Sequence, residues 1–251
     1  MKRATKLLFS ALFLLFLTSC FEAEVFPEAP FIELESLRYR DTDGLDSLIL
    51  SFKFEDGEGD LGLNDNVGDL LAPYHIYSYI ADENDSIVTL SDPFITPPLY
   101  KIPIVVQPGE NGENEPFIAG PREIFSETDN RPSYDCHNYE VVRSDTIYVA
   151  RNEFYNNFHL EFYKKTRGIY NEIDFGAIFQ NDDCDIGNFN GRIPLYDPNG
   201  KEGVITYSIL SRLFRLSFLD DTIQMRFWIY DRDLNKSNVV ETPDFVLSDL
   251  L

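Results

Sequence analysis

The chain has 251 residues and a formal net charge of −22, with 43 acidic residues against 21 basic ones. Such an acidic protein repels nucleic acid and favours cations or basic partners. Hydrophobic residues make up 43% of the chain and aromatic residues 14%, which excludes a disordered protein and is typical of one large or two small globular domains.

The first 19 residues have the three parts of a secretory signal: a basic start, an apolar run over 7–17 and small residues before the cleavage point. The apolar run is too short to cross a bilayer. The tetrapeptide Leu17-Thr18-Ser19-Cys20 resembles the bacterial lipobox, which implies cleavage before Cys20 and lipid attachment to its sulfur. We therefore expect residues 1–19 to be a cleaved signal peptide and residues 20–30 to be a lipidated tether.

The residues after Cys20 bear on where the anchor lies. An Asp at the next position retains bacterial lipoproteins in the inner membrane, and this chain has Phe21 there. Glu22 and Glu24 resemble the acidic export signal of surface lipoproteins in the Bacteroidetes. We expect a lipid anchor in the outer membrane, on either the periplasmic face or the cell surface.

From Phe31 onward, apolar and polar residues alternate in runs rich in β-branched and aromatic side chains, which indicates half-buried strands. Such runs lie at 48–54, 147–149, 173–179 and 223–229. Clusters of Gly, Pro, Asn and Asp between them are typical of turns. The pattern predicts an all-β fold, an antiparallel immunoglobulin-like β-sandwich, with little helix beyond a short one within 203–218.

The segment 92–132 is rich in proline, which is confined to the edges and loops of sheets, so we predict a long insertion or crossover there. We expect one elaborated domain over 31–251. An echo between 54–62 and 179–187 supports the alternative of two tandem β-domains split near 130–150.

A cation site is predicted from a Gly-rich acidic loop. Ca²⁺ takes six to eight oxygen ligands, and flexible glycines let closely spaced carboxylates converge on one ion. The candidate ligands are Asp56, Glu58, Asp60, Asn64 and Asp65. The loop is not an EF-hand, because its twelfth position is Val67 instead of Glu, and an acidic turn leaving a strand is the alternative. Asp231 and Asp233 are expected to pair with Arg232 or to cap a turn.

Two cysteines follow the lipidated one. In an oxidising envelope, Cys136 and Cys184 predict a disulfide, the alternative being two free buried thiols. Zinc is disfavoured, because only His137 lies near Cys136 and no paired cysteine spacing is present.

An Asp-(Ser/Thr)-aliphatic triplet occurs four times, which is typical of a polar turn feeding a strand. The triplet also resembles the O-glycosylation acceptor of exported Bacteroidetes proteins. The acceptor residues would be Ser47, Ser86, Thr146 and Thr222.

Two longer blocks carry a wider resemblance. The sequences at 52–62 (FKFEDGEGDLG) and 228–243 (WIYDRDLNKSNVVETP) are similar to the two signature blocks of a group of uncharacterised Bacteroidetes outer-membrane lipoproteins. The resemblance implies an immunoglobulin-like β-sandwich, no assigned activity, and two blocks that belong to one fold.

No catalytic motif is recognisable: the three histidines are dispersed, and no nucleophile elbow, zinc-protease helix or phosphate-binding loop occurs. We therefore expect a non-catalytic binding or accessory module of the cell envelope, with a protein or glycan partner, and no nucleic acid. A structural component of an outer-membrane complex is the alternative, and a carboxylate-dependent hydrolase ranks below both.

Overall fold

The structure is a computed structural model. It describes residues 26–40, 47–63, 73–108, 114–118, 122–131, 138–142, 145–175, 188–194, 200–210, 218 and 220–250. Nearly all of its regular elements are strands, and every strand pair is antiparallel. Two short 3-10 helices, η2 (Glu153–Tyr155) and η3 (Leu247–Leu250), accompany them. The prediction of an all-β fold with little helix is confirmed.

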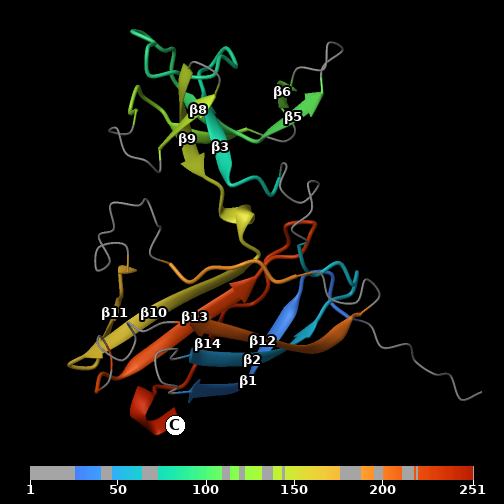
Figure 1. Cartoon of the computed structure of the whole chain (residues 1–251), viewed down its shortest axis with the longest axis vertical. Coiled ribbons are helices and arrows are strands. Elements are labelled where there is room, and N and C mark those ends of the chain that lie inside the picture. The colour runs from blue at the N-terminus through green and yellow to red at the C-terminus, as the bar shows by residue number, and fades with distance from the viewer. Residues whose placement is uncertain are drawn as a thin grey trace, which may run out of the picture.

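The larger part of the molecule, here called the framework region, consists of two facing sheets (Figure 1). The first has the order β1-β2-β12, and the second has the order β11-β10-β13-β14. Their bounds are β1 Phe31–Arg40, β2 Ser47–Glu55, β10 Phe158–Thr166, β11 Ile169–Glu172, β12 Glu202–Leu210, β13 Ile223–Ile229 and β14 Val240–Glu241.

A single hydrophobic core lies between these two sheets. The predicted alternation along β2 is seen in burial, because Leu48, Leu50, Phe52 and Phe54 are at most 1% exposed, whereas Ile49 is half-buried and Lys53 exposed. The ring of Phe52 lies 5.8 Å from that of Phe158 on β10 and 5.4 Å from that of Phe227 on β13. The framework region is thus an antiparallel β-sandwich, and its immunoglobulin-like topology stays a prediction.

The second part, here called the inserted region, leaves the framework after β2 and returns to it at β10 (Figure 1). It holds a five-stranded sheet of order β7-β4-β3-β9-β8 and a separate hairpin, β5-β6. Their bounds are β3 Tyr77–Ala81, β4 Leu99–Ile102, β5 Ile104–Pro108, β6 Asn114–Ile118, β7 Glu123–Ser126, β8 Tyr139–Val142 and β9 Asp145–Arg151.

The Pro-rich segment 92–132 therefore lies inside the inserted region, where it supplies β4 to β7. One cluster of buried residues lies on each face of the five-stranded sheet, with Tyr79 on one face and Ile80 on the other. The number of folding units, one over 31–251 or two split near 130–150, stays a prediction.

Two local predictions need correction. The short helix expected within 203–218 is wrong over 203–210, because these residues belong to β12. Ile205 and Ile209 alternate with exposed residues there and face Phe52 and Leu48 of β2, so packing against β2 decides for a strand. Over the expected strand 173–179, the three described residues 173–175 lie outside any strand, and 176–179 lie outside the structure's described part.

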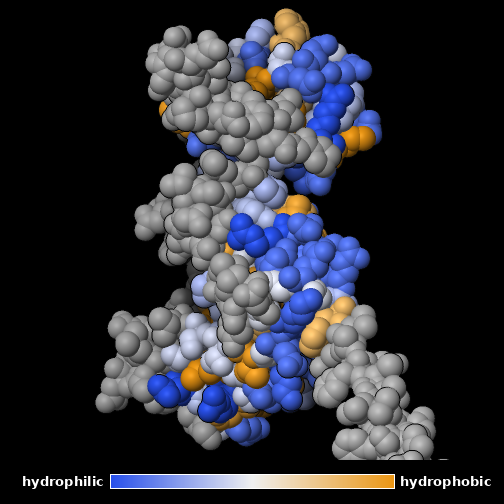
Figure 2. Space-filling view, turned by 90° about the vertical axis from the view of Figure 1, so that its right-hand side faces the viewer, coloured by the Kyte–Doolittle hydropathy of each residue, from blue (hydrophilic) through white to orange (hydrophobic). Residues whose placement is uncertain are grey.

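The coloured residues on the face shown in Figure 2 are mostly hydrophilic, with small separate hydrophobic spots among them, as the acidic composition suggests. Within the described ranges, no helix has the length and apolar character needed to cross a membrane.

Candidate cation site

The acidic loop that follows β2 is organised around the carboxylate of Asp56. This side chain is 0% exposed, and its two oxygens accept the backbone N–H groups of Glu58 at 3.3 Å and of Asp60 at 3.0 Å. Gly59 has a φ of 71°, a left-handed conformation that favours glycine. The loop therefore wraps around its first carboxylate and brings the following ones close to it.

The same loop lies between two other parts of the chain. The Gly57 N–H donates to the Pro27 carbonyl at 2.7 Å, and a Cβ at Gly57 would lie 2.6 Å from that oxygen. The Asp56 N–H donates to the carbonyl of Lys201, just before β12, at 2.7 Å. The acidic loop is thus fixed against the end of the expected tether and the start of β12.

A second acidic loop follows β13. Asp231 is 2% exposed, and its two oxygens accept the backbone N–H and the side-chain amide of Asn235 at 2.7 Å and 2.9 Å. Leu234 has a φ of 66°, which completes a tight turn between them. The prediction that an aspartate caps a turn here is confirmed for Asp231.

The two loops meet, and five carboxylates come together although the loops are about 170 residues apart in the sequence. Oxygens of Asp56, Asp60 and Asp231 all lie within 4.8 Å of one another, and so do oxygens of Glu58, Asp60 and Asp233. Two oxygens that bind one Ca²⁺ at 2.3 to 2.6 Å lie at most about 5 Å apart. Each set of three thus meets the distance requirement for a shared cation, and Asp60 belongs to both sets.

Asp60 carries an uncompensated charge at the centre of this cluster. Its Oδ1 is buried and accepts no hydrogen bond within the described part of the chain. Burial, followed by the carboxylates of Asp231 and Asp56, raises the pKa of Asp60 to about 6. An unpaired carboxylate oxygen shielded from water is unfavourable unless it binds a proton or a cation.

The pKa values of two neighbouring carboxylates are also raised. Burial raises the pKa of Asp231, and the hydrogen bond and repulsion from Asp233 raise the pKa of Glu58. Among the described residues, none of the five carboxylates forms an ion pair with Lys or Arg. Lys201 and Arg232 lie beside the cluster and donate to the carbonyls of Gly57 and Gly62, so among the described residues no carboxylate of the cluster is paired directly with a cation.

The structure brings three of the predicted ligands together and adds two. Asp56, Glu58 and Asp60 converge as expected, whereas Asn64 and Asp65 lie outside the described residues. Sequence reasoning missed Asp231 and Asp233 as ligands. The available signal was the resemblance, which placed the two acidic blocks in one fold.

The other predicted modification sites are scattered. Ser86 is exposed, Thr146 and Thr222 are half-buried, and Ser47 is 9% exposed within β2. The lipid-bearing Cys20 and the predicted disulfide partners Cys136 and Cys184 lie outside the described residues, so both predictions stand as made.

Comparisons with known proteins do not assign this chain to a family. No protein-family model matches this chain, and neither a curated protein nor a solved structure has a significant match to it.

Proposed function

We propose that this chain is a lipid-anchored, non-catalytic binding or accessory module of the cell envelope, and that Ca²⁺ holds its two acidic loops together. The observation that carries the proposal is the Asp60 Oδ1, which is buried and has no hydrogen-bond partner among the described residues, on a carboxylate that clusters with those of Asp56 and Asp231. A cation at that point would neutralise the three charges at once and compensate the burial of the oxygen.

The donor set favours Ca²⁺ over other metals. All five side chains offer carboxylate oxygens, which are hard ligands, and neither His nor Cys belongs to either set. Mg²⁺ demands near-ideal octahedral geometry and keeps several waters, whereas Ca²⁺ accepts irregular sites with more protein oxygens. A flexible loop with glycines at 57 and 59 fits the second case better.

The position of the site suggests its role. The cation would join the loop after β2 to the loop after β13, on opposite sheets of the framework sandwich. The first loop also contacts Pro27, which lies within the lipidated tether expected over 20–30. Calcium would then fix the module's orientation next to its membrane anchor, and present it to an envelope protein or glycan.

Calorimetric titration of the chelator-treated protein tests the cation site. We expect heat of binding with Ca²⁺ and a weaker response to Mg²⁺. A cation at 100 times its dissociation constant would stabilise the folded protein by about 2.7 kcal/mol, which raises the melting temperature. Absence of heat and of any melting shift at 10 mM Ca²⁺ would refute the site.

A matched pair of variants separates specific binding from general charge effects. Asp231→Asn removes one ligand, while Asp220→Asn removes an exposed carboxylate outside the cluster. We expect only the first to lose the calcium response. Partner capture from solubilised envelope, with calcium or with chelator, then tests the binding role, and hydrolysis of an envelope glycan by the pure protein would contradict it.

A further inference from the structure

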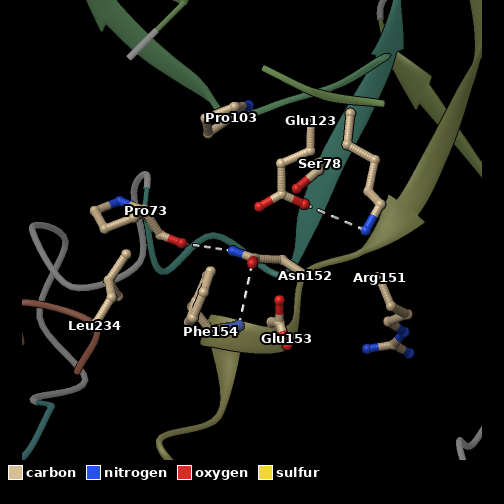
Figure 3. A pocket seen from close by; sticks show the side chains of 10 residues that line it. Pro73, Ser78, Pro103, Glu123, Arg151, Asn152, Glu153, Phe154 and Leu234 are labelled. Carbon is tan, nitrogen blue, oxygen red and sulfur yellow. Dashed lines mark hydrogen bonds and ion pairs between the residues drawn. The ribbon is translucent and has the colours of Figure 1, made fainter. Parts of the chain in front are cut away.

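A cavity of about 290 Å³ lies in the inserted region where it approaches the framework region (Figure 3). The residues of its wall come from both, since Pro73 and Pro103 belong to the inserted region and Leu234 to the loop after β13. Phe154 of η2 completes the apolar part of the wall. The volume is close to the lower end of the range for small-molecule sites in proteins.

The floor of this cavity is a row of polar side chains on one face of the five-stranded sheet. Glu123 on β7 is the direct cross-strand partner of Lys101 on β4, and Lys101 is the direct partner of Ile80 on β3. Ser78 lies two residues before Ile80, so its side chain is on the same face. A carboxylate, an ammonium group and a hydroxyl therefore lie side by side along the floor of the cavity.

These three groups retain unused hydrogen-bonding capacity. Ser78 is only 9% exposed, and its hydroxyl points into the cavity without a hydrogen-bond partner in the described part of the chain (Figure 3). The Lys101 Nζ and the Glu123 Oε2 are 3.6 Å apart, too far for a good hydrogen bond. Their side chains are 35% and 57% exposed, so each can reach a ligand.

Two of the three remaining polar residues of the wall are not available in the same way, and the third, Glu153, is an exposed carboxylate at the start of η2. Asn152 uses its amide N–H groups on the carbonyls of Pro73 and His75, and its oxygen accepts from the backbone of Phe154. The Arg151 guanidinium lies over the Tyr77 ring and points away from Glu123 in Figure 3. Asn152 thus shapes the cavity, whereas the row of Ser78, Lys101 and Glu123 can recognise a ligand.

We infer that this cavity binds a small zwitterion with an apolar side group, such as a free dipeptide. The ligand's carboxylate would bind Lys101 and the Ser78 hydroxyl, its ammonium group would bind Glu123, and its side chain would contact Phe154 and Leu234. Charge-assisted hydrogen bonds at both ends are stronger than the hydrogen bonds of a neutral ligand. None of the five clustered carboxylates lines this cavity, although Leu234 of its wall belongs to the second acidic loop.

The test is calorimetric titration of the full-length, detergent-solubilised protein with the dipeptide Ala-Leu. Three controls accompany it: the N-acetylated dipeptide, the C-terminally amidated dipeptide, and maltose as a neutral polyhydroxylated ligand. We expect a dissociation constant of about 0.1 to 1 mM for Ala-Leu and about tenfold weaker binding when either end is blocked. No binding of Ala-Leu at 10 mM, equal binding of the blocked forms, or a preference for maltose would each overturn the inference.

Two variants assign the two ends of the ligand. Lys101→Met should bind Ala-Leu and its amide equally, whereas Glu123→Gln should bind Ala-Leu and its N-acetyl form equally. Lys53→Met, at an exposed lysine of the framework region, is the matched control and should keep the preference for free ends. The assignment would be contradicted if Lys53→Met lost the preference for free ends, or if both cavity variants kept it. Unchanged melting temperatures would exclude misfolding as the cause of any loss.

Discussion

The framework and inserted regions are both antiparallel β-structures, yet they are stabilised differently. In the framework region two sheets enclose one core, in which Phe52, Phe158 and Phe227 contact one another. In the inserted region a single sheet carries a small cluster on each face. Because apolar burial is the main stabilising contribution to folding, we expect the framework region to be the more stable of the two.

The exposed apolar residues show the same difference. Phe94 is 91% exposed, Val141 72% and Ile124 57%, and all three belong to the inserted region. Among the described residues of the framework region the largest such value is 66%, for Ile169 at the turn between β10 and β11, and three others are 41% to 47% exposed. Unequal burial of apolar side chains predicts that the two regions respond differently to mutation.

The largest effect is expected in the framework core. Phe227→Ala removes a fully buried ring and leaves a cavity between the two sheets, so it should reduce the free energy of unfolding by about 3 to 5 kcal/mol. Chemical denaturation followed by far-UV circular dichroism measures this loss. A loss below 1 kcal/mol would mean that the two sheets do not share the core seen here.

A core substitution in the inserted region should act locally. Ile80→Ala, at a side chain that is 0% exposed in β3, should cost about 2 to 4 kcal/mol, a loss confined to this region. Hydrogen exchange read by mass spectrometry should then show faster exchange in β3, β4 and β9, with β2 and β13 unchanged. Equal acceleration in both regions would show that they unfold as one unit.

Two strands of the framework, β2 and β13, could be predicted from the sequence because one face of each is fully buried. Buried apolar side chains therefore recur at every second position over 48–54 and 223–229, and β2 and β13 lie where this pattern predicts them. Burial alternates along β12 as well, but Val204 on its exposed face is apolar and 42% exposed, which interrupts the alternation in the sequence and explains the mistaken helix. A strand can thus be predicted from the sequence when apolar residues mark one buried face.

The candidate cation site was only half predictable. Asp56, Glu58 and Asp60 are neighbours in the sequence, so their spacing predicted a shared site. Asp231 and Asp233 join them only through the packing of the two sheets, which no local pattern contains. The cavity over Ser78 and Lys101 was not predicted at all, because cross-strand pairing between β3 and β4 creates it.

At the acidic loops we expect a smaller change in stability, whose sign depends on whether calcium is present. In chelator at pH 7.5, Asp60→Asn removes a charge repelled by Asp56 and Asp231, so it should stabilise the protein by on the order of 1 kcal/mol after solvent screening. In excess Ca²⁺ the same variant should be less stable than the original, because it lacks a ligand. Thermal unfolding in the two buffers measures both signs. The same sign in both buffers would contradict a calcium site and leave only a charge effect.

The smallest effect concerns the outer face of the framework, where His159 is 8% exposed and stacks on Trp228 at 5.1 Å. Its Nε2 lies 2.9 Å from the Asn156 carbonyl, to which it can donate. Burial lowers the pKa of His159 below 6.5, and the charge of Lys236 acts in the same direction, against raising contributions that include Glu161 and the hydrogen bond to Asn156. The folded protein therefore holds this imidazole neutral where the unfolded chain protonates it.

The sign of the pH dependence follows from this difference. The contribution of neutral His159 is fully present above pH 6.5 and is lost as the pH falls from 6.5 toward the lowered pKa of the folded state. The slope for one proton is at most about 1.4 kcal/mol per pH unit. His159→Gln cannot titrate and should flatten the curve of unfolding free energy over this range, measured by urea denaturation in chelator at several pH values. Parallel curves for the variant and the original protein would assign the acid sensitivity to groups other than His159.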